Sequence, residues 1–136
     1  MNFTVDSSFA LAWVFEDEAT AQCDKVFERF GAGATAIVPS PWRWEIGNAL
    51  LIAERRKRIT AAEIREHFNF LLTLPIDING HSVEQAWSET HRLAQQHKLT
   101  SYDAAYLELT IRRGLPLASR DADLRAAAQA EKVRLL

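Results

Sequence analysis

The sequence has one cysteine, no long apolar run and almost no net charge. Cys23 has no second cysteine to pair with, which excludes a disulfide-stapled secreted scaffold and a thiolate metal site. The longest apolar runs, such as 9–15, are far shorter than the ~20 residues of a membrane-spanning helix. No basic segment precedes an apolar stretch near the N-terminus, and Asp6 interrupts that region, so a signal peptide is not expected. We expect a cytoplasmic protein with no membrane association.

Glycine and proline are also scarce, with five and four residues, and they form no linker-like cluster. The chain has 136 residues, of which 48% are hydrophobic and 25% charged. These values are typical of one globular domain that spans residues 1–136. Sixteen basic and 18 acidic residues give a formal charge of −2, which disfavours the broad basic surface common in nucleic-acid binders.

Short β-branched or apolar runs alternate with longer helical patterns along the chain. This alternation predicts a three-layer α/β/α fold with a central, mostly parallel sheet of about five short strands. The Ser40-Pro41 pair, capping-box pairings at 60/63 and 82/85, and glycines at 31 and 114 mark helix ends. We expect strands at 2–5, 35–38, 76–78, 115–119 and 133–136, and helices at 7–13, 17–30, 41–57, 60–72, 82–97, 101–113 and 121–130.

Two carboxylates stand where a parallel sheet would form a ligand site. Asp6 closes the first expected strand, and the carboxyl ends of parallel strands share one edge of a sheet. Asp6 can instead be a helix N-cap, although Ser7 and Ser8 are able to cap that helix themselves. Glu45 falls inside or at the margin of an apolar helix face, where it is either buried with a partner or extended into solvent. Asn48, one turn on, can orient the carboxylate or a ligand, or be a surface residue.

Three further carboxylates occupy comparable positions. Asp103 lies in the first turn of a helix, on the same side as Tyr106, but the helix dipole favours an acidic residue there whatever its function. Asp121 follows the strand expected at 115–119, and Asp123 comes two residues later. Either of these two can be a simple N-cap.

Acidic residues gathered at one sheet edge would repel one another unless cations neutralise them. Oxygen ligands without nearby Cys or His favour Mg²⁺ or Mn²⁺ over zinc. No histidine falls at an expected strand end, so all four are expected to be solvated surface residues. The pattern therefore predicts a magnesium site.

The sequence resembles a PIN-domain ribonuclease, and more narrowly the toxin of a VapBC toxin/antitoxin pair. The resemblance covers essentially the whole chain and is carried by four motifs in order: Val5-Asp6-Ser7-Ser8, Glu45 with Asn48-Ala49-Leu50, Tyr102-Asp103-Ala104-Ala105-Tyr106, and Leu117-Ala118-Ser119-Arg120-Asp121. By this resemblance Asp6, Glu45, Asp103 and Asp121 match the acidic quartet. Ser7 and Ser119 match the accompanying hydroxyl positions, and Asp123 is an extra candidate ligand.

The resemblance implies a Mg²⁺-dependent endoribonuclease that cleaves RNA with a metal-activated water. It also implies a cognate antitoxin whose tail fills the acidic groove, in a heterotetramer or larger assembly. Without the four proposed ligands, 14 acidic residues remain against 16 basic ones, a formal charge of +2. Weak overall acidity therefore does not exclude an RNA substrate once metal is bound.

Trp44 and Leu51 lie opposite the apolar stripe of the helix expected at 41–57. A helix that is apolar on two faces is covered on both, either by a second copy of the chain or by another segment of the same chain. We expect a homodimer through this face.

Two other functions remain open from the sequence alone. One is a PIN-like module that binds partners without catalysis. The other is a phosphatase-like enzyme in which Asp6 is the nucleophile, although no lysine stands at a later strand end to support it.

Overall fold

The computed structural model describes residues 1–136. Its strands are β1 (Thr4–Val5), β2 (Ala36–Val38), β3 (Ile76–Ile78) and β4 (Leu117–Ala118). The α-helices are α1 (Ser7–Leu11), α2 (Ala21–Gly31), α3 (Pro41–Arg55), α4 (Ala61–Leu72), α5 (Val83–Gln85), α6 (His91–His97), α7 (Ser101–Arg113) and α8 (Ala122–Ala130). A 3₁₀ turn, η1 (Glu16–Glu18), precedes α2, and a π-helical segment, η2 (Ala86–Thr90), joins α5 to α6.

All strand pairings are parallel, as the alternating pattern predicts. β1 pairs with β4, and β2 pairs with β3. A single parallel bridge between Phe3 and Ala36 connects the two pairs in the order β3-β2-β1-β4. The strand expected at 133–136 is reduced to one bridge, between Leu135 and Leu117. Hydrogen bonds from the Leu117 N–H to the Arg134 carbonyl and from the Leu136 N–H to the Leu117 carbonyl hold this segment beside the sheet, and Leu135 and Leu136 pack against the core.

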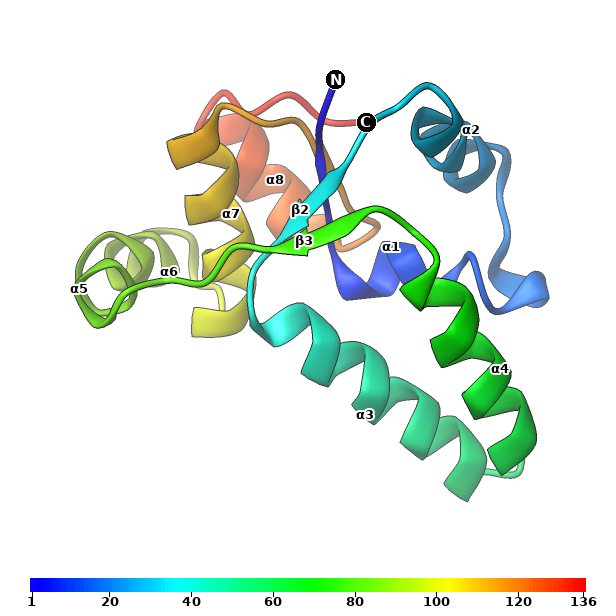
Figure 1. Ribbon diagram of the computed structural model, residues 1–136. Coiled ribbons are helices and arrows are strands. Elements are labelled where there is room, and N and C mark those ends of the chain that lie inside the picture. The colour runs from blue at the N-terminus through cyan, green and yellow to red at the C-terminus, as the bar shows by residue number, and fades with distance from the viewer.

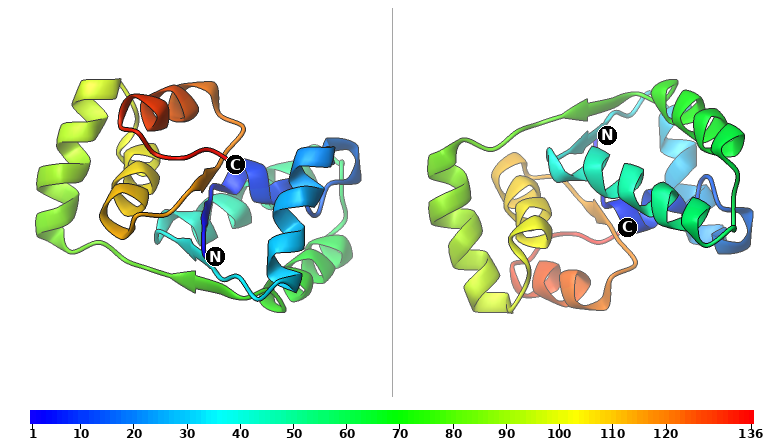
Figure 2. Two further views of the ribbon diagram at one scale, coloured as in Figure 1. Left: turned by 90° about the horizontal axis from the view of Figure 1, so that it is seen from above. Right: turned by 90° about the horizontal axis from the view of Figure 1, so that it is seen from below.

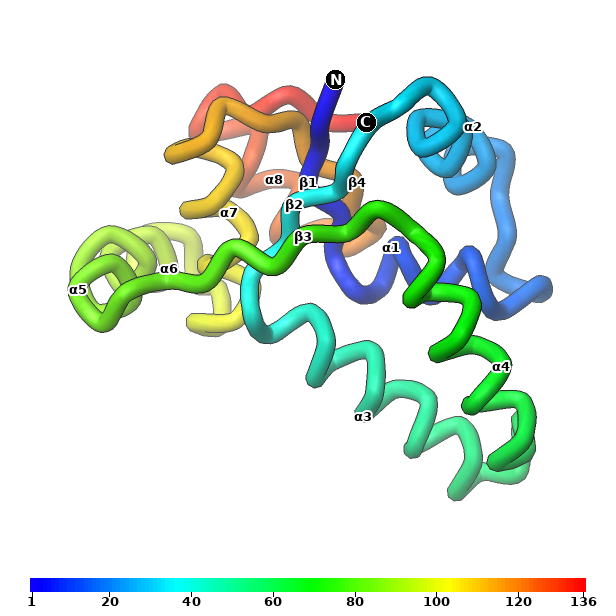
Figure 3. Tube along the Cα trace, in the orientation of Figure 1, coloured from blue at the N-terminus to red at the C-terminus, as the bar shows by residue number.

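The strands occupy the centre of the molecule with helices on both sides (Figure 1). Helices α5 to α8 lie to one side of the strands, and α2 and α4 lie to the other (Figure 2). A cluster of 26 buried residues forms the core, with Phe3, Val5 and Leu117 from the strands fully buried. Both termini lie at one end of the strands, and α3 begins at the opposite end (Figure 3). None of the helices combines the length and apolar character needed to cross a bilayer.

Several helix ends agree with the local sequence signals. Thr60 caps α4 in a capping box, and Gly114 ends α7 in the left-handed conformation that glycine adopts without strain. One other predicted start and one predicted cap were wrong. The helix expected from residue 17 begins at Ala21 with Thr20 as its cap, because Glu16–Glu18 form a separate turn. Ser40 precedes Pro41 as expected, but its own backbone is helical and its side chain caps nothing.

The expectation that all four histidines are solvated was also wrong. The His81 side chain is 8% exposed and its Nε2 lies 2.6 Å from the carboxylate of Glu108, which is itself buried and paired with Arg112. His97 is partly buried against Glu131. Both pairs join segments far apart in the chain, so no local pattern indicated them.

Candidate active site

The helices that carry the predicted site residues start at the carboxyl edge of the parallel strands. β1 runs into α1 and β2 runs into α3, while β4 leads to α8. The first turns of these helices therefore face the same edge, where the strands end (Figure 1). Asp6 and Asp121 cap α1 and α8, and Glu45 lies near the start of α3. Asp103 lies in the first turn of α7, which follows α6 and no strand.

Asp6 is the most deeply buried of these carboxylates, at 5% exposure. Its Oδ1 accepts hydrogen bonds from the Phe9 N–H, at 2.8 Å, and from the Ser8 hydroxyl, at 2.9 Å. Its Oδ2 accepts from the buried Ser119 hydroxyl. Asp6, not Ser7 or Ser8, is thus the N-cap of α1, which selects one of the alternatives that the sequence left open. Asp6 is therefore both the helix cap and a candidate site residue, because β1 ends where α1 begins.

Glu45 lies half-buried on α3 and has a specific partner. Its Oε1 accepts a hydrogen bond of 2.7 Å from the hydroxyl of Tyr106, a fully buried residue of α7. Ser7 also lies beside that hydroxyl. Burial and the neighbouring Glu45 charge raise the pKa of Tyr106, so its hydroxyl stays protonated as a donor. The glutamate is therefore held toward the other carboxylates instead of extending into solvent.

The remaining predicted residues line the outer part of the site. Asp103 is half-buried in the first turn of α7, where its N–H donates to the Thr100 hydroxyl. Asp121 is exposed and caps α8 by accepting from the Leu124 N–H at 2.8 Å. Asp123 is also exposed. Asp121 is thus a cap and a site candidate at once, like Asp6.

Ser119 links two of the site positions. Its hydroxyl donates to Asp6 and accepts from the backbone N–H of Asp121 at 3.0 Å. One buried side chain therefore fixes the end of β4 against the end of β1. This geometry gives the predicted supporting residue a definite structural role.

The carboxylates of the site are electrostatically coupled. Burial raises the pKa of Asp6, and the Asp121 charge raises it further against the lowering effect of the hydrogen bonds. Burial raises the pKa of Glu45, and the charges of Asp103 and Asp6 add to that effect. Burial also raises the pKa of Asp103, as do the charges of Asp121, Asp6 and Asp123. The acids lie close enough to repel one another.

No basic side chain compensates this charge. None of the five carboxylates is in an ion pair, since every salt bridge of the chain uses other acids. Arg120 is next to Asp121 in sequence but donates to the Ser8 carbonyl and pairs with Glu18 at 2.8 Å. Arg125 donates to the Ser119 carbonyl. The site is a concentration of uncompensated negative charge.

The donor set suits a hard cation. It consists of carboxylate and hydroxyl oxygens, which bind Mg²⁺ and Mn²⁺ in preference to zinc. No three His, Cys, Asp or Glu side chains converge tightly enough in the structure to hold an ion as they stand. The fit to a metal rests on the oxygen chemistry and on the mutual repulsion of the carboxylates, which a divalent cation would relieve.

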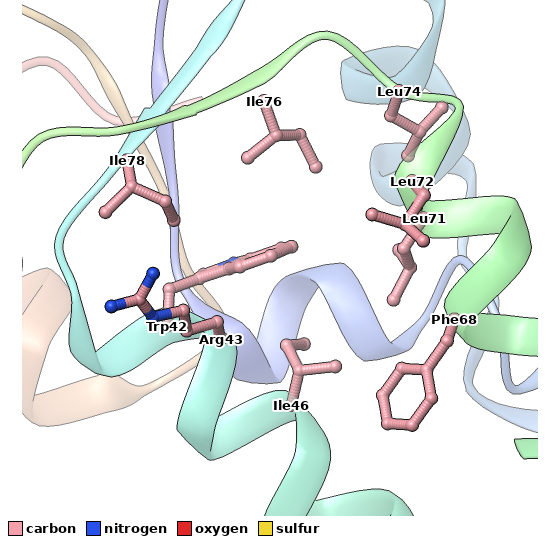
Figure 4. Close-up of a pocket in the computed structure, with 9 residues that line it drawn as sticks. All are labelled: Trp42, Arg43, Ile46, Phe68, Leu71, Leu72, Leu74, Ile76 and Ile78. Carbon is pink, nitrogen blue, oxygen red and sulfur yellow. The ribbon is translucent and has the colours of Figure 1, made fainter.

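Two hollows lie on different faces of α3. One, of about 460 Å³, is lined by Glu45 and Asn48 together with the exposed ring of Trp44 and therefore opens beside the carboxylates. The other, of about 550 Å³, is apolar and lies between α3, α4 and β3 (Figure 4). Trp42, Arg43 and Ile46 form its α3 wall, and none of the predicted site residues lines it, so it is separate from the acidic site.

Sequence reasoning missed the role of Tyr106, although its spacing of three residues from Asp103 placed it on the same helix face. Its partner Glu45 is 61 residues away, so the hydrogen bond had no local signal.

The structure also leaves Trp44 at 70% exposure, which shows that no other segment of the chain covers it.

Comparison with known proteins identifies the fold. The chain is similar to the crystal structure of PAE2754 from Pyrobaculum aerophilum, with a TM-score of 0.74 and 24% identity over 99% of this chain and 83% of that one. It is also similar to VapBC2 from Rickettsia felis bound to a DNA fragment from their promoter, with a TM-score of 0.69 and 11% identity over 100% of this chain and 98% of that one. No curated protein sequence matches it significantly. The family model of the PIN domain matches residues 3–130, and the chain therefore belongs to the PIN domain family.

Proposed function

We propose that the protein is a Mg²⁺-dependent endoribonuclease, with Mn²⁺ as an alternative ion, and the toxin of a toxin/antitoxin pair. PIN domains are generally nucleases, which supports hydrolysis of a phosphodiester. The observation that carries the proposal is the group of uncompensated, mutually repelling carboxylates at the carboxyl edge of the sheet. Such a group suits a metal that in turn binds a phosphate.

Asp6 and Asp103 would hold the metal, together with Glu45 and Asp121 and with Asp123 at the rim. When bound, Mg²⁺ lowers the pKa of a coordinated water and neutralises charge on the scissile phosphate. The protein's own residues position the ligands. Ser119 and the Phe9 N–H fix both oxygens of Asp6, while Tyr106 fixes Glu45. Asn48 lines the hollow beside Glu45, where its amide can reach the substrate.

Cleavage of labelled RNA by the purified protein tests the proposal. We expect turnover in Mg²⁺ or Mn²⁺, none in excess chelator, and loss of turnover in Asp6→Asn and Asp103→Asn, since these changes remove ligand charge with little change in shape. Asp24→Asn, which alters an exposed acid of α2, is the matched control and should cleave as the parent does. Unchanged cleavage by Asp6→Asn would rule the mechanism out.

Metal binding can be measured without activity. Bound Mg²⁺ stabilises the folded state by mass action, so the melting temperature of the parent should rise with Mg²⁺ concentration. The rise should disappear in Asp103→Asn. If Mg²⁺ has no effect on the parent and RNA stays intact, the chain is a non-catalytic PIN-like binding module.

The phosphatase-like alternative, in which Asp6 is the nucleophile, fits less well. Both oxygens of Asp6 accept hydrogen bonds and the residue is 5% exposed.

The proposed partners are an RNA substrate, an antitoxin and a second copy of the chain. The antitoxin tail would fill the acidic groove, with an arginine among the carboxylates, in a heterotetramer or larger complex. The structural likeness to VapBC2 supports this partnership. Co-purification with the product of a small adjacent gene, and inhibition that is lost when arginines of its tail are replaced by alanine, would test it.

The proposed homodimer uses the outer face of α3. Trp44 is 70% exposed there and Leu51 is 38% exposed, so this face is available to a second copy. We expect a dimer in sedimentation at high micromolar concentration and a shift toward monomer in Trp44→Ala. Leu72→Ala, a change to an 82% exposed residue of the separate apolar hollow, serves as the control. A monomeric parent at that concentration would contradict the dimer.

A further inference from the structure

A third hollow, distinct from the two on α3, adjoins the candidate active site on its α7 side. It has a volume of about 260 Å³ and includes the rings of Trp87 and Tyr102 and the polar side chains of His81, Thr90 and Ser101 in its lining. Small-molecule sites span ~300–1,000 Å³, so this hollow is the size of a fragment such as one nucleobase. It is too small to be a groove for a helix.

The hollow is continuous with the acidic site. It shares Ser40, Pro41 and Tyr102 with the hollow that contains Glu45 and Asn48. Tyr102 directly precedes Asp103 in the first turn of α7. An RNA strand with one phosphate at the carboxylates would therefore place a neighbouring nucleotide beside Tyr102 and Trp87.

The two aromatic rings are unusually exposed for their size. Trp87 is 79% exposed and Tyr102 is 64% exposed, so neither contributes much to the core. Exposed aromatic rings offer flat apolar faces, and single-stranded nucleic acids use such faces for base stacking.

Thr90 supplies a second, independent observation. The residue lines the same hollow, is 3% exposed, and its hydroxyl has no hydrogen-bond partner in the protein. A buried polar group without a partner is costly, and a polar ligand edge would remove that cost. Thr90 and Trp87 both belong to the π-helical segment η2, a distortion that is frequent at functional sites.

We propose that this hollow binds one unpaired nucleobase of the RNA substrate, with Tyr102 and Trp87 stacking on the base and Thr90 and Ser101 bonding to its edge. The proposal rests on the ribonuclease function and assigns to it a contact with one base beside the carboxylates. The bases of a paired helix are stacked on one another and unavailable to such a site. Tyr102 and Trp87 are thus specificity-determining residues.

Binding of short fluorescein-labelled RNA tests the hollow apart from turnover. The background for these measurements is the parent chain with Ca²⁺ in place of Mg²⁺, because Ca²⁺ also takes oxygen ligands and leaves the proposed metal site unmutated; gels confirm that the RNA stays intact. Trp87→Ala and Tyr102→Ala should each raise the Kd by roughly 5- to 150-fold, the range expected for loss of one stacked base. The phenylalanine variants at both positions should restore most of the affinity, because they keep a flat ring. Val83→Ala, also exposed and on the neighbouring α5, should bind as the background does.

Photocross-linking supplies a second readout. RNA that contains a single 5-iodouridine should cross-link to the peptides that carry Trp87 or Tyr102, and annealing the RNA to its complement should abolish the cross-link. Cross-links that map only elsewhere would overturn the proposal.

The outcomes separate this hollow from the proposed activity. Cleavage of RNA by the parent together with unchanged RNA affinity in both alanine variants would overturn the base site and leave the ribonuclease standing. Loss of affinity in both variants from a parent that does not cleave RNA would support the base site and refute the ribonuclease. Disruption of an oligomer by Trp87→Ala without any effect on RNA would make this surface a protein interface and overturn the base site.

Discussion

Replacing Tyr106 with phenylalanine removes one hydroxyl group from the candidate site and leaves the rest of the ring in place. Tyr106 is fully buried, and its hydroxyl donates a 2.7 Å hydrogen bond to Glu45. The raised pKa of Tyr106, caused first by burial, keeps this hydroxyl a donor at any ordinary pH. The variant therefore tests one interaction between α7 and α3.

The expected loss follows from the partners of that bond. A hydrogen bond to a charged group contributes ~1.5–3 kcal/mol to stability. Glu45 is only half-buried, so water can replace part of the lost interaction. We expect the free energy of unfolding to fall by about 1–2 kcal/mol, which for a chain of this length corresponds to roughly 3–10 °C in melting temperature. The bond also orients a proposed metal ligand, so Mg²⁺ affinity should fall by roughly 10- to 100-fold.

Urea unfolding of Tyr106→Phe and Tyr102→Phe measures the effect directly. Tyr102 is the other tyrosine of the chain and is 64% exposed, so its variant should unfold as the parent does. A double-mutant cycle with Glu45→Gln should show coupling between Tyr106 and Glu45. Equal unfolding midpoints for the two tyrosine variants, or strictly additive effects in the cycle, would refute the reasoning.

Two further predictions concern stability. The folded-state pKa values of Asp6, Glu45 and Asp103 are raised, first by burial, so the folded protein retains protons that the unfolded chain releases. In chelator, the contribution of these groups to the free energy of unfolding should fall as pH rises from the ordinary pKa values, 3.8 for aspartate and 4.5 for glutamate, through the raised values. Urea titrations across that window check this, and Asp103→Asn should flatten the slope. Ser119→Ala should cost about 1–3 kcal/mol in the same assay, because it leaves an Asp6 oxygen and the Asp121 N–H without their partner; a loss below ~0.5 kcal/mol would contradict this bonding pattern.

Much of the fold was predictable because its signals are local. The capping boxes of Thr60 with Glu63 and of Ser82 with Gln85 are both present, since each depends on residues three apart in one helical turn. The alternation of short apolar runs and helices predicted a parallel sheet, and every observed strand pairing is parallel. The same logic placed acidic residues at strand ends and on inward helix faces and so indicated a candidate site.

The sequence by itself therefore determined the order of the elements and which acids would stand near the carboxyl edge. Only the tertiary structure decided which atoms meet there. The hydrogen bond from Tyr106 to Glu45 spans 61 residues and the one from Ser119 to Asp6 spans 113. Asp6 caps α1 in place of the adjacent serines, and Ser119 from a distant strand bonds to its other oxygen. Local propensity allows several caps and several buried faces, and the packing of distant segments selects among them.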